Sequence, residues 1–225
     1  MANQLVLNVI VPGPARHDVV STQLLVDGRD LLRGLFPAGP GDDPDYLLDR
    51  LVPQPEPHEA RLAEAPCTEG CCGALYVTVR QEGDVIIWNE WRNPDNPHLD
   101  APELRFSRSA YLAELERADR ERAWEWIGRT FARLLREQIH RNPEVLLQWD
   151  CTLDFVECLP WERDRVRLFI TSPRRQQIRQ DTPWNQYGIF FDATGDPVEQ
   201  QANSALAALK DRDPRTWADR VGGSR

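Results

Sequence analysis

The stretch GALYVTVRQEGDVIIWNEW, residues 73–91, decides the fold class. Leu75, Val77 and Val79 alternate with more polar side chains, which is the period of a half-buried strand. The turn residues Glu82-Gly83-Asp84 interrupt this pattern, and an apolar run resumes it from Val85 to Trp91. Two strands joined by so short a turn pair as an antiparallel hairpin. The stretch therefore predicts antiparallel β structure.

Signals on both sides of the hairpin extend this prediction. Apolar segments at residues 5–11 and 20–26 predict two further strands, and the second segment ends at Asp27-Gly28, a dipeptide typical of tight hairpin turns. Asp43-Pro44 predicts a helix start, because Asp caps helix N-termini and Pro fits the first helical position. The same type of pair recurs at Asn142-Pro143, Asp196-Pro197 and Asp213-Pro214.

The second half of the chain predicts more helix. Residues 107–140 predict helix that is broken or bent near Asp119. One core-facing stripe consists of Trp124, Ile127, Phe131 and Leu134 or Leu135. Strands are expected at residues 165–170 and 187–191. We therefore predict an α+β fold in which a mostly antiparallel sheet is packed on one side by helices. No linker-like stretch interrupts the chain, so we expect a single domain over residues 1–225, strand-rich over 1–106, helical over 107–149 and strand-helix over 150–225.

Composition excludes several functional classes. The chain has 225 residues and a net charge of −9, and Lys210 is its single lysine. A phosphate-binding Walker A loop is absent, and a Schiff-base enzyme would depend on Lys210. The acidic balance argues against sequence-independent nucleic-acid binding, which needs cations to neutralise phosphates. Apolar runs are too short for a membrane span and no secretory signal is present, so we expect a cytoplasmic protein with reduced thiols.

The densest unusual feature is PCTEGCCG, residues 66–73, just before the hairpin. Zinc takes about four thiolate or imidazole ligands, and a tight turn can supply two or three of them. A zinc site would use Cys67, Cys71 and Cys72, with His58, Cys151 or Cys158 as the missing ligand. Two other interpretations stay open: a redox or nucleophilic thiol, and small hydrophobic side chains buried at a turn.

The same region carries a resemblance. The segment CTEGCCGALYVTV, residues 67–79, followed by GDVIIW, residues 83–88, resembles a group of actinobacterial proteins with no assigned activity. In that group a cysteine-bearing turn ending in Cys-Gly leads into a hairpin that finishes in Val-x-Trp. Several members carry Cys-x-x-Cys ahead of the turn, whereas Cys67 stands alone here. The resemblance implies a bacterial cytosolic setting and no particular reaction.

A second feature is the enrichment in tryptophan and arginine. Arginine binds carboxylates and phosphates in bidentate fashion, and aromatic and arginine side chains are enriched at protein interfaces. The candidate partner-binding or anion-binding residues are Trp88, Trp91, Arg92, Arg165, Arg167, Arg174 and Arg175. The alternative is that these arginines pair with neighbouring carboxylates and the tryptophans fill a core.

Three functional hypotheses follow. The first is a non-catalytic interaction protein, of regulatory or immunity type, that binds another protein through an exposed sheet face and needs no cofactor. The second is a metal-binding protein with zinc at the cysteine turn. The third is an enzyme whose pocket is assembled from residues far apart in the sequence, because the chain lacks the common catalytic motifs and its four histidines are scattered.

Overall fold

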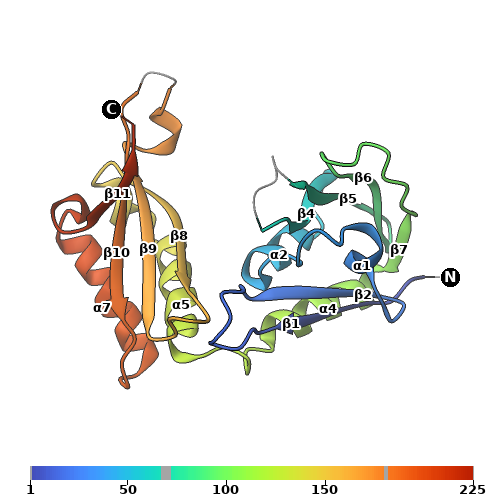
Figure 1. The fold of residues 1–225 in the computed structure, drawn as a ribbon, viewed down its shortest axis with the longest axis horizontal. Coiled ribbons are helices and arrows are strands. Elements are labelled where there is room, and N and C mark those ends of the chain that lie inside the picture. Colours follow the sequence, from blue (N-terminus) through green and yellow to red (C-terminus); the bar gives the residue numbers. More distant parts are fainter. Residues whose placement is uncertain (1, 67–71, 180–181, 225) are drawn as a thin grey trace. The chain divides into compact units, whose positions relative to one another are not determined.

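The chain adopts an α+β fold in a computed structural model, which describes residues 2–66, 72–179 and 182–224 (Figure 1). The strands form three sheets, and neighbouring strands within each sheet are antiparallel. The predicted fold class is therefore confirmed. The chain divides into two compact units, unit 1 with Met1–Pro12 and Asp18–Trp124, and unit 2 with Gly13–His17 and Glu125–Arg225.

The sequence predicted one domain over residues 1–225, whereas the structure describes two compact units. The boundary between Trp124 and Glu125 falls in the stretch ERAWEW, residues 121–126, whose charged and aromatic composition is not that of a linker. The helical stretch predicted over residues 107–140 is broken close to Asp119, where the sequence predicted a break or a bend. It forms two helices, α4 (Arg108–Arg120) in unit 1 and α5 (Ile127–Arg141) in unit 2. Phe131 is buried as predicted, but Ile127 is 56% exposed.

Unit 1 contains two sheets and three described helices. The first sheet consists of β1 (Leu5–Ile10), β2 (Ser21–Val26) and β3 (Arg29–Asp30). The second consists of β4 (His58–Glu64), β5 (Ala74–Glu82), β6 (Val85–Arg92) and β7 (Leu104–Ser107), in chain order. With α4, the helices are α1 (Leu31–Leu35) and α2 (Pro44–Leu51).

Local signals account for several of these elements. Asp27 and Gly28 both have positive φ, as the tight turn between β2 and β3 requires. The Asp43 side chain accepts a hydrogen bond from the main-chain N–H of Asp45 and so caps α2. Asp213 caps a 3-10 turn in the same way. The side chains of Asn142 and Asp196 make no such cap, because the N-cap positions of the helices that follow are occupied by Pro143 and Pro197.

Main-chain hydrogen bonds tie the two sheets of unit 1 together at both ends. At one end, the Asn3 N–H donates to the Arg105 carbonyl of β7 at 2.6 Å. At the other end, the Asp42 N–H donates to Leu62 of β4 at 2.8 Å, and the Asp42 carbonyl accepts from Thr22 of β2 at 3.1 Å. The two sheets are therefore hydrogen-bonded to each other at both ends, and they enclose a core to which α2 and α4 also contribute side chains.

Unit 2 is a single sheet with helices on one face (Figure 1). Its strands are β8 (Thr152–Cys158), β9 (Arg165–Ser172), β10 (Asn185–Asp192) and β11 (Asp219–Gly223), in the spatial order β11-β10-β9-β8. Its other helices are α6 (Glu144–Leu147) and α7 (Val198–Asp211). The core lies between the helices and the sheet, and includes Phe131 and Leu135 of α5, Leu168 of β9 and Ala205 of α7.

Candidate functional site

The sheet of unit 2 has two chemically different faces. Val166, Leu168 and Ile170 of β9 are fully buried against the helices. Because successive side chains of a strand point to opposite faces, Arg165, Arg167 and Phe169 lie on the face that α5 and α7 do not cover. Strand register places Phe155 of β8 and Gly188 of β10 on either side of Phe169.

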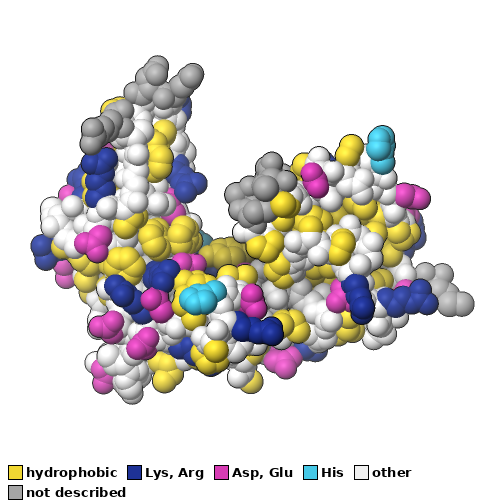
Figure 2. Space-filling model, in the orientation of Figure 1, with side chains coloured by type: hydrophobic (Ala, Val, Ile, Leu, Met, Phe, Trp, Pro, Cys, Tyr) yellow, Lys and Arg dark blue, Asp and Glu magenta, His cyan; other side chains and the backbone are white. Residues whose placement is uncertain are grey.

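A row of three phenylalanines crosses this open face. The rings of Phe155 and Phe169 stack with their centroids 4.6 Å apart, and Phe190 meets Phe169 edge to face at 6.3 Å. Each of the three is half-buried, and none packs against the core of unit 2. Figure 2 shows hydrophobic side chains gathered over these strands.

Gly188 makes room for the row. A Cβ at this position would lie 3.2 Å from Cγ1 of Val221, 3.3 Å from the Phe190 ring and 3.4 Å from the Phe169 ring. Val221 of β11 is 46% exposed and continues the apolar surface across the fourth strand. We call Phe155, Phe169, Phe190 and Val221 the phenylalanine face. It is an apolar strip that spans the whole width of the sheet.

Charged side chains border one end of the phenylalanine face. The Arg165 guanidinium lies 4.6 Å from the centroid of the Phe190 ring, a cation–π distance. Arg167 forms an ion pair with Glu162 and lies 3.9 Å from Glu157. This end therefore carries arginines whose charge is partly balanced by carboxylates.

A buried carboxylate anchors the other end. The side chain of Asp154 is fully buried, and it accepts hydrogen bonds from Thr171 Oγ1 at 2.7 Å, Gln186 Nε2 at 2.8 Å and Arg175 Nε at 2.9 Å. The ladder between β8 and β9 shifts register at Asp154, as at a β-bulge. Because three side chains donate to it, this carboxylate holds the 3-10 turn Arg175–Gln177 at the sheet end and is suited to a structural role.

The structure brings the predicted arginines of this region together in part. Arg165 and Arg167 share one end of the open face, and Arg175 lies at the other end. Arg174 turns away from the face, since its guanidinium donates to the Leu147 carbonyl at 2.7 Å and lies 3.4 Å from Asp150. Arg167, Arg174 and Arg175 have carboxylate partners. This agrees with the alternative interpretation that the arginines of this region pair with neighbouring carboxylates.

The other predicted partner-binding residues belong to unit 1. Trp88 is fully buried, where its indole N–H donates to the Tyr111 hydroxyl at 3.2 Å, so it is a core residue without surface to offer a partner. The indole N–H of Trp91 donates to the Pro102 carbonyl at 2.9 Å. Arg92 makes a bidentate pair with Glu59 at 2.7 Å, and this hydrogen bonding raises the pKa of Arg92 and lowers that of Glu59.

The outer face of the unit 1 sheet is ionic. Arg80 pairs with Glu82 and lies 3.6 Å from Glu103, while Arg105 pairs with Glu103 at 2.8 Å and lies 3.9 Å from Glu82. Strand register places Ile87 between Arg80 and Arg105, and Ile87 is fully buried. This face resembles an ordinary solvated surface, in contrast to the phenylalanine face of unit 2.

The predicted zinc ligands are not assembled by the described residues. Cys67 and Cys71 lie outside them. Cys72 packs beside the unit 1 core, next to the end of β4, whereas His58 begins β4 and directs Nε2 to the Arg50 carbonyl at 2.8 Å. β4 has seven residues, from His58 to Glu64, so six steps along the strand separate its two ends by about 20 Å. Among residues 2–66, 72–179 and 182–224, no three His, Cys, Asp or Glu side chains group as a metal site. The zinc hypothesis stays a prediction.

The remaining thiols are buried. Burial raises the pKa of Cys151 to about 11 and also raises the pKa of Cys158. The Cys158 sulfur accepts a hydrogen bond from the Trp126 indole at 3.1 Å. A thiol with a raised pKa is protonated at neutral pH and therefore a poor nucleophile.

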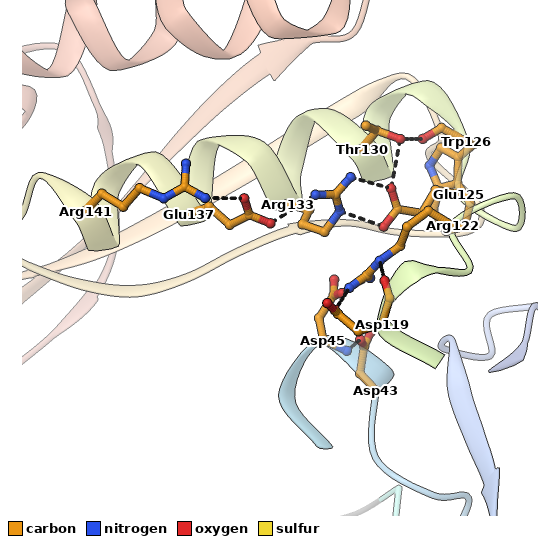
Figure 3. A network of polar contacts seen from close by, with 10 residues as sticks. All are labelled: Asp43, Asp45, Asp119, Arg122, Glu125, Trp126, Thr130, Arg133, Glu137 and Arg141. Carbon is orange, nitrogen blue, oxygen red and sulfur yellow. Dashed lines mark hydrogen bonds and ion pairs between the residues drawn. The ribbon is translucent and has the colours of Figure 1, made fainter. Parts of the chain in front are cut away.

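Buried carboxylates in both units have arginine partners (Figure 3). In unit 2 the Glu125 side chain, 1% exposed, accepts hydrogen bonds from Arg133 at 2.8 Å and from Thr130 at 3.0 Å. In unit 1 the Asp45 side chain, 2% exposed, pairs with Arg122 at 2.7 Å. The Glu125 carboxylate, two residues before α5, therefore holds the first turns of that helix, and the Asp45 carboxylate of α2 holds the segment that follows α4.

No protein-family model matches this chain, and neither a curated protein nor a solved structure is similar to it. Within the described ranges of the chain, no helix has both the length and the apolar character that crossing a lipid bilayer requires. What the fold and the site define is a class: an α+β protein of two units, one of which displays an apolar aromatic strip bordered by charges.

Proposed function

We propose that this protein is a non-catalytic interaction protein that binds another protein through the phenylalanine face of unit 2. The observation that carries this proposal is the aromatic row on the open side of the sheet. Protein interfaces combine an apolar, aromatic-rich centre with a polar and charged rim, and the Phe155–Phe169–Phe190 row with its bordering arginines has that layout.

The bordering charges indicate what the partner presents. Arg165 rests on the Phe190 ring, and the described ion pairs of the neighbouring Arg167 are made with Glu162 and Glu157. A partner carboxylate opposite Arg165 would form a charge-assisted hydrogen bond at the rim, while apolar partner side chains cover the phenylalanines. The proposed partner surface is therefore apolar with an acidic residue at one edge.

The experiment compares three forms of the full-length protein as bait in a lysate of the native host. The first is the wild type, the second carries F155S, F169S and F190S, and the third carries V19S, V52S and I127S, which remove three exposed apolar side chains elsewhere. Proteins bound to each bait are quantified by mass spectrometry. Circular dichroism and urea unfolding check that all three baits are folded.

The proposal expects a partner that the wild type and the control variant retain equally and that the phenylalanine variant loses by tenfold or more. With that partner purified, F169A alone should weaken binding at least tenfold, as truncation of an interface anchor does. If every captured protein is held equally well by the phenylalanine variant, the proposal is refuted.

A further inference from the structure

Strand β10 is paired along only half of one edge. Strand β9 pairs with all of Asn185–Asp192, whereas β11 pairs with Asn185–Gly188 alone (Figure 1). In the part of the chain that the structure describes, the second edge of Ile189–Asp192 has no main-chain partner. Alternate residues of such a stretch direct N–H and C=O groups outward, which makes it a template for an added strand.

A groove runs beside this open edge. It has a volume of about 480 Å³ and lies between Phe190, Phe191 and Asp192 of β10 and Gln201, Ser204 and Ala205 of α7. Phe131 of α5 also lines it, and no residue of β8 or β9 does, so the groove is on the unpaired side of β10. The small side chains Ser204 and Ala205 leave space that side chains of an added strand would fill.

One end of the groove is acidic and held in place. The ionisable side chains that line the groove are Asp192 and Asp196. The Gln201 side chain fixes the loop that carries Asp196, since it accepts from the Thr194 N–H at 2.9 Å and donates to the Asp196 carbonyl at 2.8 Å. Arg165 is the strand partner of Asp192, but its guanidinium lies over the Phe190 ring.

We propose that the groove between β10 and α7 binds an extended peptide segment of another protein, which adds as a strand to Ile189–Asp192 and places a lysine or arginine near Asp192 and Asp196. Four residues of β10 offer about 14 Å of edge, enough for a segment of four or five residues. Main-chain hydrogen bonds supply affinity in such complexes, and the pockets beside the strand select side chains. This inference does not rest on the proposed function, because it uses the edge of the sheet and α7. The two sites share Phe190, so the variant that separates them, F155S/F169S, leaves Phe190 in place.

The test selects peptides from a random heptapeptide library displayed on phage, with the full-length protein as the target. Selected peptides are synthesised, labelled with fluorescein and titrated by fluorescence anisotropy. S204W fills the groove from an exposed position of α7, and A207W places the same side chain at an exposed position of α7 that does not line the groove. D192N/D196N removes the acidic end, and F155S/F169S alters the phenylalanine face.

The proposal expects peptides rich in β-branched residues with a Lys or Arg at one end. S204W should weaken their binding at least tenfold, and A207W should leave it within twofold. D192N/D196N should weaken binding about three- to tenfold, less so at high salt, since exposed charge pairs are screened. Methylating alternate peptide nitrogens should abolish binding, because it removes the donors that pair with β10. F155S/F169S should have no effect, which separates this site from the phenylalanine face.

Three outcomes would overturn the inference. The first is a library that yields no peptide above background. The second is a set of selected peptides that binds S204W as well as the wild type. The third is a concentration-dependent dimer of the wild type, seen by light scattering and lost in S204W, which would identify the occupant as a second copy of this chain instead of another protein.

Discussion

Removing the hydroxyl of Tyr111 should destabilise unit 1 far more than the loss of one oxygen atom suggests. Tyr111 is 1% exposed, and its hydroxyl donates to the Leu51 carbonyl at 2.8 Å while accepting from the indole N–H of the fully buried Trp88 at 3.2 Å. Tyr111→Phe leaves both partners in the core without a hydrogen bond. Each buried group left unsatisfied costs about 1–3 kcal/mol, so we expect a loss of about 2–4 kcal/mol in the free energy of unfolding.

Hydrogen exchange measured by mass spectrometry tests this prediction in unit 1 alone. If the slowest amides of β5 and β6 exchange through unfolding of the unit, a loss of about 2–4 kcal/mol should speed their exchange roughly 30- to 900-fold. Tyr76→Phe is the matched control, since Tyr76 is half-exposed on the outer face of β5, and it should change exchange less than threefold. Equal protection of β5 and β6 in Tyr111→Phe and in the wild type would refute the reasoning.

Three further predictions concern unit 2. Gly128→Ala should lower the free energy of unfolding, measured in urea titrations, by about 1–3 kcal/mol. The new Cβ would lie 2.3 Å from the main-chain oxygen of Arg163 and 2.6 Å from the sulfur of Cys158. Gly195→Ala is the control and should be neutral, because its Cβ would have no atom within 4 Å. Glu125→Gln should cost about 2–4 kcal/mol by the same measurement, since it breaks a buried ion pair, and Glu116→Gln in an exposed pair should cost less than about 0.5 kcal/mol. Burial raises the pKa of Cys151 from 9.0 to about 11, so the folded state favours the protonated thiol. The stability that this preference provides is complete below pH 9 and is lost as the pH rises toward 11. Cys151→Ala should therefore flatten the curve of unfolding free energy against pH in that range.

The hairpin prediction succeeded because its signal is local. The alternation over residues 73–91 depends on neighbours within each strand, and β5 and β6 follow it. The strand β8 was missed for the converse reason. Its sequence TLDFVEC places an acidic residue, Asp154, at a register shift, so the apolar residues on either side do not alternate with a single period.

The candidate site could be predicted only in part. Alternation along residues 165–170 places Arg165, Arg167 and Phe169 on one side of a strand, and the structure has them there. Which residues of β8 and β10 lie beside Phe169 depends on register between strands far apart in the sequence, which composition and periodicity do not determine. Phe155 and Phe190 were therefore not expected. Trp88 was a candidate partner-binding residue because its type favours interfaces, and a core position was the alternative. Tertiary packing buries Trp88, and composition alone could not decide between the two.

The main-chain hydrogen bonds of Asn3 and Asp42 have a practical consequence for producing the protein. Exposed edge strands promote aggregation, and these hydrogen bonds cover the edges of β7 and β4 with the chain's own backbone. Deleting the first four residues would expose the edge of β7 and promote aggregation. An affinity tag that disturbs Asn3 would do the same, so a C-terminal tag is the safer choice for producing soluble material.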